Sequence, residues 1–287
     1  MTLISIILGL ALEYVSGSLD RMRNYSWFEH YTQWLELRCA GKSFWDGPLG
    51  VILTLALPLL VLISLSWVLG RASILLVFIL ATAVFIYSLG TDLNIVLDRY
   101  VAALQRDDET TIGSLEEVLQ VRGVGGASDE ERMLRSIIIR SHEYTFGVIF
   151  WFIVLGMAGA LLYCLVIRLR LRCAEVTGRY ADSVRNLHNI LRWPSTRLQA
   201  VGFAVAGNLV DALDAWHTVA AEASHDSDDV IGATGIGAAR RTVVPGEETE
   251  VRRFANQVQE IQALINRTLI VWLAVLGLMT LAGWFRF

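Results

Sequence analysis

The sequence has few of the residues that shape small secreted or loop-rich proteins, with three cysteines and four prolines in 287 residues. Cys39, Cys164 and Cys173 form no C-x-x-C pair, so we expect neither a disulfide framework nor a zinc site. The chain also has no large surplus of positive or negative residues, because the formal net charge is -4 and acidic and basic residues are intermixed. This balance argues against nucleic acid as a partner, and no metal or other cofactor is expected.

Long apolar runs are abundant. Apolar residues make up 54% of the chain, and four runs are long enough to cross about 30 Å of hydrocarbon, which takes about 20 helical residues. The runs do not alternate polar and apolar residues as barrel strands do, so helices are the expected spanning structure. They cover residues 47–70, 72–91, 144–167 and 268–285.

The predicted fold class is all-α, a polytopic helical membrane protein. It has four transmembrane helices, a short apolar N-terminal helix and a buried or re-entrant amphipathic helix. Only Gly70 and Arg71 separate the first two runs, which predicts a tight hairpin. The predicted segments are an apolar helix and basic loop (1–46), the hairpin (47–91), a helical extramembrane loop (92–143), the third span (144–167), an amphipathic or re-entrant region (168–223), a flexible linker (224–250) and a C-terminal helix with the fourth span (251–287).

The number of spans between two loops predicts whether the loops lie on the same face of the membrane or on opposite faces. Residues 13–46 and 92–143 are expected on one face of the membrane, and residues 168–267 on the other. The numbers of Lys and Arg residues near the span ends are similar on the two faces. Seven arginines between residues 168 and 197 nevertheless favour the cytoplasm for the face that carries residues 168–267.

The loop 92–143 carries local signals for helices. An apolar stripe runs from Leu93 to Leu104 with helical period, and Ser128 followed by Glu131 is a capping signature. The acidic run 107–109 fits a solvated helix end better than a metal or phosphate site, because no second ligand cluster is nearby in the sequence.

The stretch "NILRWPSTRLQAVGFAVAGN", residues 189–208, is nearly apolar but carries Pro194. We expect a break there, with Arg192 and Trp193 extended just before it. The 13 uncharged residues 198–210 are too few to span and fit a buried or re-entrant helix. Arg197 near its start requires an anion, which Glu143, a lipid phosphate or a substrate would supply; the alternative is a snorkelling anchor.

No complete catalytic set is expected. The third span contains small residues at the spacing that allows close helix packing, which predicts a protein partner or a second copy there in addition to the lipid bilayer. The candidates for ligand or phosphate binding are Arg197, Glu143, His142, Arg106 and Asp107, and the helix-packing candidates are Gly156 and Ala160.

Three segments in order resemble one family. "LHNILRWPSTRLQAVGFAVAGNLVDALDAW" resembles the signature of the AmpE inner-membrane proteins, D-W-x-P-x-R-L followed by an apolar helix, A-G-D and a later Trp. "HEYTFGVIFWFIVLGMAGALLY" resembles the family's F-W-F-x-x-x-G-P-x-G-A-L-L-Y segment. The N-terminal "MTLISIILGLALEYVSGSLDRMRNYSWF" resembles its apolar start with Glu13 and a basic stretch. The departures are Arg192 for Asp, Met157 for Pro and Asn208 for an acidic residue, and they predict that Arg192→Ala is nearly silent.

The resemblance implies a multi-pass protein of the bacterial inner membrane with a regulatory or scaffold role in β-lactamase induction and cell-wall recycling. AmpE proteins are similar in turn to the adenosylcobinamide-phosphate synthases (CobD/CbiB). This similarity implies the alternative, a membrane-bound synthetase joining a phosphorylated amino alcohol to a carboxylate. A transporter ranks last, because the spans lack interior charges and an inverted repeat.

Overall fold

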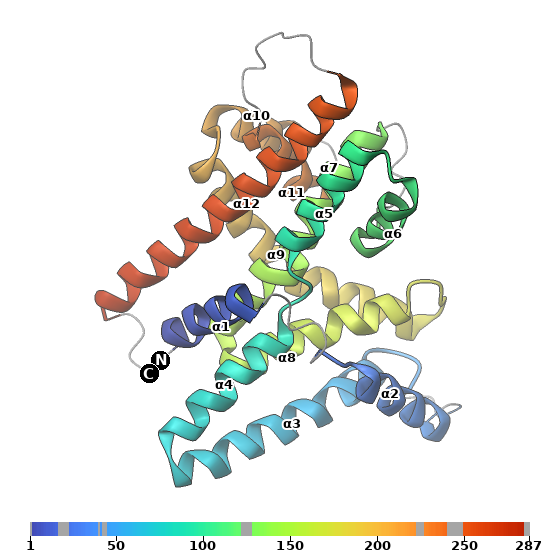
Figure 1. Cartoon of the computed structure of the whole chain (residues 1–287). Coiled ribbons are helices and arrows are strands. Elements are labelled where there is room, and N and C mark those ends of the chain that lie inside the picture. The colour runs from blue at the N-terminus through green and yellow to red at the C-terminus, as the bar shows by residue number, and fades with distance from the viewer. Residues whose placement is uncertain are drawn as a thin grey trace. The chain divides into compact units, whose positions relative to one another are not determined.

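The computed structural model describes residues 2–16, 23–39, 41, 45–121, 128–221, 227–239 and 249–283, and all regular structure among them is helical (Figure 1). The predicted all-α class is confirmed. Four helical stretches are long and apolar enough to cross a membrane by length and composition. The chain forms two compact units: unit 1 comprises Met1–Gly90 and Gly147–Trp193, and unit 2 comprises Thr91–Phe146 and Pro194–Arg286.

Unit 1 is assembled around the predicted hairpin. Helix α3 (Pro48–Ala72) is followed at once by α4 (Ile74–Ser88), and the Ser73 side chain caps α4 by accepting a hydrogen bond from the Leu75 amide at 3.2 Å. Helix α4 also packs against α1 (Thr2–Ser16) and α8 (Gly147–Arg172). The expected basic loop before the hairpin is wrong for 26–39, which form helix α2 (Ser26–Cys39) with Phe28 and Leu35 buried.

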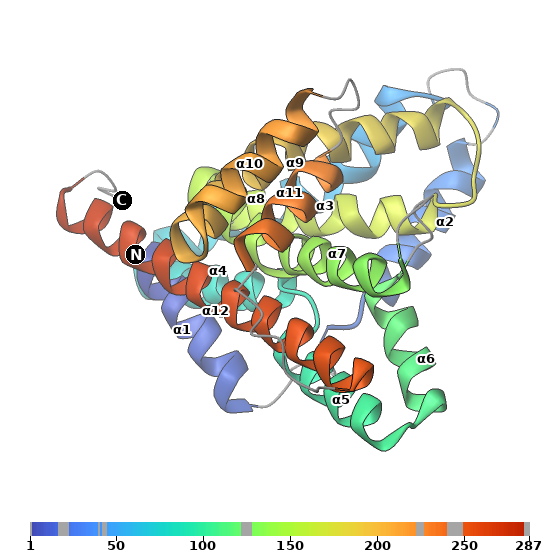
Figure 2. The same ribbon diagram turned by 90° about the horizontal axis from the view of Figure 1, so that it is seen from above.

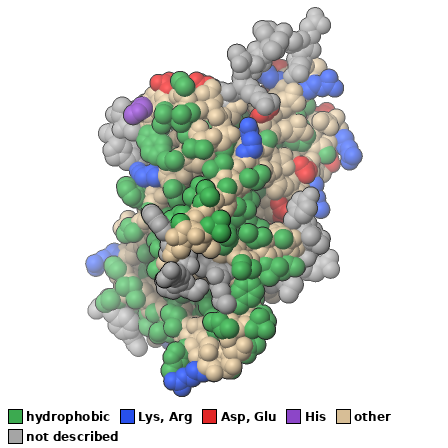
Figure 3. Space-filling view, turned by 90° about the vertical axis from the view of Figure 1, so that its left-hand side faces the viewer, with side chains coloured by type: hydrophobic (Ala, Val, Ile, Leu, Met, Phe, Trp, Pro, Cys, Tyr) green, Lys and Arg blue, Asp and Glu red, His purple; other side chains and the backbone are tan. Residues whose placement is uncertain are grey.

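Much of the hairpin surface is apolar and exposed. Leu60 is 61% exposed on α3 and Ile74 is 62% exposed on α4, and hydrophobic side chains cover much of the face shown in Figure 3. A soluble monomer rarely exposes apolar patches of more than a few hundred Å², so this surface indicates contact with lipid.

Helix α8 turns back on itself in the middle of the predicted third span. Gly156 has φ 67° and ψ −154°, outside the helical region. A Cβ on Gly147 would collide with the ring of Tyr163, sixteen positions later, whereas one straight helix would separate them by about 24 Å. The two arms, 147–155 and 157–172, therefore run antiparallel. Gly156 and Ala160 do not form the predicted packing ridge on one helix face, because the break is at Gly156 itself.

Unit 2 is a layer of packed helices (Figure 2). In sequence order they are α5 (Leu93–Arg106), α6 (Glu109–Leu119), α7 (Asp129–Ser141), the π-helix η2 (His142–Phe146), the end of α9 (Arg179–Ala206), α10 (Leu209–Ala221), α11 (Ser227–Ala239) and α12 (Glu250–Leu281). The predicted stripe on α5 is confirmed by the burial of Leu93, Leu97 and Tyr100. The predicted cap of α7 is also confirmed, since Ser128 Oγ accepts from the Glu131 amide at 3.2 Å.

The predicted linker 224–250 is wrong for the thirteen residues of α11, which are largely buried. The glycines that suggested a mobile segment permit close packing instead. A Cβ on Gly235 would lie 2.7 Å from Ile138 of α7, and one on Gly237 would lie 2.7 Å from the Asp211 carbonyl of α10. Of the remaining linker residues, Thr249 and Glu250 lie at the start of α12, and 224–226 and 240–248 lie outside the described residues.

The predicted break at Pro194 is also wrong, because α9 runs through it from Arg179 to Ala206. A proline inside a helix removes one hydrogen bond to the carbonyl four residues earlier. That carbonyl belongs to Ile190, whose residue is 68% exposed. The predicted helix 198–210 ends early, at Ala206, where the Asn208 amide donates to the Ala238 carbonyl of α11 at 2.9 Å.

Contacts within unit 2 do not fit the predicted separation of residues 92–143 from residues 194–267, the part of the second predicted loop that belongs to this unit. Helix α7 packs against α11, and α5 packs against α12. Arg135 lies 3.6 Å from Asp229, and the Gln262 amide donates to Asp98 at 3.0 Å. These contacts hold the segments together in one compact unit.

The break at Gly156 supports a stability prediction. Its backbone region is accessible almost only to glycine, so Gly156→Ala is expected to lower the free energy of unfolding by about 1–3 kcal/mol. Gly277 on α12 is the matched control, because it too has nothing within 4 Å of an added Cβ but lies inside a regular helix. Gly277→Ala is expected to stabilise by up to about 1 kcal/mol. Unfolding in mixed micelles measures both, and equal effects would contradict the assigned break.

Candidate functional site

The most buried polar residues of unit 2 gather around the π-helix η2, at the end of α7. His142 is completely buried, and Glu143 is 1% exposed. A π-turn inserts one extra residue into a helix, changes which side chains face the core, and often marks a functional position. From α9, Ser195 and Gln199 face this turn, since residues four apart share one face of a helix.

Hydrogen bonds link these side chains in a chain. Ser195 Oγ lies 3.1 Å from His142 Nε2, and His142 Nδ1 lies 2.7 Å from Gln199 Oε1. Gln199 Nε2 donates to Ser141 Oγ at 3.2 Å, and Ser141 Oγ donates to the Ile138 carbonyl at 2.7 Å. All four side chains are at most 1% exposed.

The donor and acceptor of each of these hydrogen bonds follow from the last bond of the series. Because the Ile138 carbonyl only accepts, the Ser141 hydroxyl donates to it and accepts from the Gln199 amide nitrogen. Gln199 Oε1 must then accept, so His142 Nδ1 carries a proton. In a neutral imidazole Nε2 then accepts the Ser195 hydroxyl proton. The bonds thus assign one tautomer and join η2 to α9.

This geometry places a hydroxyl, a base and an orienting group in the order used by nucleophilic hydrolases. Ser195, His142 and Gln199 are nevertheless each 0% exposed. A substrate cannot reach the Ser195 hydroxyl in this arrangement. In this structure the hydrogen bonds therefore hold α9 against η2.

A buried ion pair adjoins the chain. The Arg140 guanidinium donates to the Glu143 carboxylate, three residues later, and the two side chains are 5% and 0% exposed. Arg140 Nε also donates to the Leu119 carbonyl at 3.1 Å, at the C-terminus of α6, where free carbonyls and the helix dipole favour a cation. Arg140 thereby connects α6, α7 and η2.

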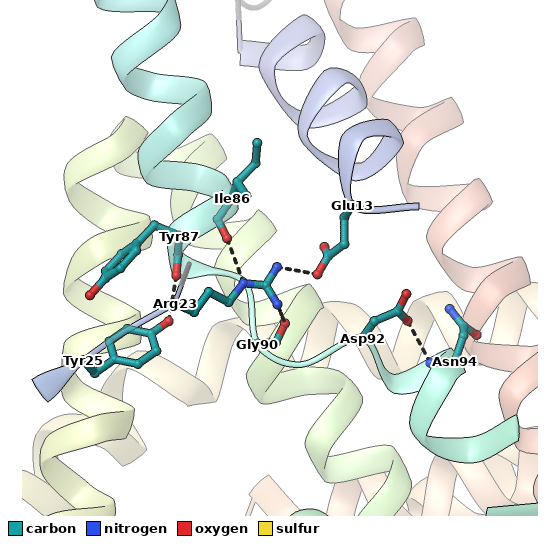
Figure 4. Close-up of polar contacts among 8 residues, drawn as sticks. All are labelled: Glu13, Arg23, Tyr25, Ile86, Tyr87, Gly90, Asp92 and Asn94. Atoms are coloured by element: carbon teal, nitrogen blue, oxygen red, sulfur yellow. Dashed lines mark hydrogen bonds and ion pairs between the residues drawn. The ribbon is translucent and has the colours of Figure 1, made fainter. Parts of the chain in front are cut away.

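Unit 1 contains a second buried ion pair (Figure 4). Arg23 donates to the Glu13 carboxylate of α1, to the Gly90 carbonyl, and to the Ile86 carbonyl at 3.2 Å. The last two groups lie at the C-terminus of α4, so Arg23 caps this helix and binds α1 to it. The hydroxyl of Tyr25 donates to the Tyr87 carbonyl at 2.7 Å, beside the same helix end.

The structure brings together two of the five predicted binding residues, His142 and Glu143. Arg106 and Asp107 are instead exposed at the junction of α5 and α6. Arg197 is half-buried on α9, two residues after Ser195. No group of three or more His, Cys, Asp or Glu residues in the described ranges has the geometry of a metal site.

The acidic run acts as a helix junction. Asp107 ends α5 with φ 56°, and Asp108 caps α6. Hydrogen bonds from Thr111 and then from Thr110 lower the pKa of Asp108 to about 2, so this carboxylate stays charged at neutral pH.

The sequence analysis missed Arg140, Ser195, Gln199 and Arg23. Two local signals were available: the three-residue spacing of Arg140 and Glu143, and the four-residue spacing of Ser195 and Gln199, which place each pair on one helix face. The contact of α9 with η2 spans more than fifty positions in the sequence and had no local signal.

The comparisons with known proteins are consistent with a membrane regulator. The family model of the regulatory signalling modulator protein AmpE matches residues 1–282. The chain belongs to the AmpE family. No curated protein and no solved structure matches it. The family match includes both units, and with them the polar chain of unit 2 and the Glu13–Arg23 pair of unit 1.

The buried ion pair of unit 2 supports a prediction with an internal control. Arg140→Ala leaves Glu143 buried without its cation and is expected to cost about 3–5 kcal/mol of unfolding free energy. Arg185 and Asp182 form a pair of the same spacing whose side chains are 43% and 64% exposed. Arg185→Ala is expected to cost less than about 1 kcal/mol. Similar losses in chemical unfolding of the two variants would show that burial does not set the strength of the Arg140 pair.

The structure also reverses the expectation that Arg192→Ala is silent. Arg192 is 2% exposed and is the bulkiest of the deeply buried side chains. Its removal would leave a large cavity at a buried position, so a loss of at least about 3 kcal/mol is expected. Arg179→Ala, at an exposed position of the same helix, is the control. The yield of folded protein after membrane extraction should fall for Arg192→Ala and not for Arg179→Ala. Equal yields for the two variants would support the expectation that Arg192→Ala has little effect.

Proposed function

We propose that the chain is a multi-pass protein of the bacterial inner membrane that modulates β-lactamase induction during cell-wall recycling by changing what it binds. The observation that carries this proposal is the family match over residues 1–282, described as a regulatory signalling modulator. The exposed apolar hairpin supports a place in the bilayer. A protein partner or a second copy of the chain receives the signal.

The polar chain around η2 is a suitable element for such a signal. Its bonds are neutral, and a neutral hydrogen bond contributes about 1 kcal/mol, which corresponds to about a fivefold change in an equilibrium between two states. An arrangement held by a few such bonds responds to a ligand that favours another position of α9 against η2. We propose that the bond between His142 and Ser195 sets this equilibrium.

The alternative, a synthetase joining a phosphorylated amino alcohol to a carboxylate, has less support. It requires Arg106, Asp107, Glu143 and Arg197 to serve one substrate. Arg106 and Asp107 are exposed, whereas Glu143 is fully buried and binds Arg140. None of the comparisons matches the synthases.

The test removes one hydrogen bond in two independent ways. His142→Asn keeps a donor at the position of Nδ1 and loses Nε2, while Ser195→Ala removes the hydroxyl that Nε2 binds. In a host that lacks its own copy of the gene, each variant should change β-lactamase induction about fivefold relative to the wild type. The double variant should match the single ones, because all three lose the same bond.

His217→Asn is the control, since His217 is exposed on α10, and it should induce as the wild type does. Normal induction by both single variants, at wild-type amounts in the membrane, would refute the role of this bond. Normal induction in cells that lack the chain altogether would refute the proposed function.

A further inference from the structure

We propose that α8 is a re-entrant hairpin, which enters and leaves the membrane by the same face and presents the polar surfaces of the chain to the cytoplasm. This inference is independent of the proposed function. It rests on two separate observations, the reversal of α8 inside unit 1 and the packing of distant stretches inside unit 2.

The dimensions and the residues of α8 fit a hairpin that inserts from one side. Its first arm, 147–155, is about 13 Å long and its second, 157–172, is about 24 Å, both short of the 30 Å hydrocarbon core. The tip between them is apolar, with Val154 and Leu155 each 53% exposed.

Both ends of the hairpin are charged. Glu143 precedes the first arm, and Arg168, Arg170 and Arg172 end the second. Charges at both ends and none at the tip are the pattern expected if only the tip enters hydrocarbon, since a charge at the bilayer centre is costly.

Unit 2 requires the same conclusion through parity. Its two stretches, Thr91–Phe146 and Pro194–Arg286, are in contact through α7 and α11 and through α5 and α12. The segment between them, Gly147–Trp193, must therefore cross the bilayer an even number of times. A hairpin at α8 meets this condition with no crossing.

The orientation follows from the charges. With α8 re-entrant, the crossings are α3, α4 and the apolar end of α12. Of the 24 Lys and Arg residues in the sequence, all but Arg71, at the α3–α4 turn, and Arg286, after α12, then belong to segments on one side. The positive-inside rule assigns that side to the cytoplasm. A ligand or partner of either unit is then a cytoplasmic molecule.

The experiment labels cysteines introduced singly into the full-length chain with a membrane-impermeant maleimide. Two exposed sites flank the hairpin in the sequence: Ser114→Cys on α6 precedes it, and Glu175→Cys follows its second arm. Arg71→Cys marks the α3–α4 turn. The native Cys39, Cys164 and Cys173 are buried, and the wild-type chain measures their background.

Ser114→Cys and Glu175→Cys should both label at least tenfold more in inverted vesicles than in spheroplasts, and Arg71→Cys should show the opposite ratio. Labelling of Ser114→Cys and Glu175→Cys from opposite faces would overturn the hairpin. Labelling of both from outside would keep the hairpin and overturn the orientation. Labelling in detergent verifies that each thiol is reactive, and a site that fails there is replaced by Glu117→Cys or Val176→Cys, its exposed neighbours.

Discussion

The contact of α7 with α11 is the constraint on which the rest of the structure depends. It joins a helix that precedes α8 to one that follows it by more than fifty residues, and under the proposed topology both helices lie on one side of the bilayer. Gly235 allows this contact, because a Cβ there would lie only 2.7 Å from Ile138 of α7. The sharp turn at Gly156 is the local feature that satisfies the constraint.

The polar core follows from the same packing. Once α9 lies against η2, Ser195 and Gln199 can reach both nitrogens of His142, and these bonds define the tautomer of a neutral imidazole. The Arg140–Glu143 pair is enclosed by the same elements. Burying these groups costs free energy unless every bond is made, so the cluster specifies one arrangement of helices more than it adds stability.

Sequence patterns predicted the features that depend on local physics. The hairpin at Gly70, the apolar stripe from Leu93 and the cap at Ser128 follow from hydropathy, helical period and capping chemistry. His142 and Glu143 were predicted as binding candidates from their position at the entry of the apolar third span.

The errors have a common cause, which is that small residues have different roles in different tertiary surroundings. Gly156 in an apolar run resembles any helix-packing glycine, and hydropathy does not report its positive φ. The glycines of α11 resemble a linker until α7 and α10 are packed against them. Pro194 resembles a helix end, but α9 tolerates it beside an exposed carbonyl. The partners Ser195 and Gln199 were invisible for the same reason.

The central claim, that α7 and α11 pack against each other, is tested most directly by a crosslink. The distance from the Arg135 Cβ to a Cβ built on Gly232 is 3.8 Å, which matches the typical Cβ separation of a disulfide. An Arg135→Cys/Gly232→Cys variant is expected to form an intramolecular disulfide when native membranes are oxidised, while either single variant is not. Two thiols that stay free under oxidation, although each reacts with maleimide, would contradict it.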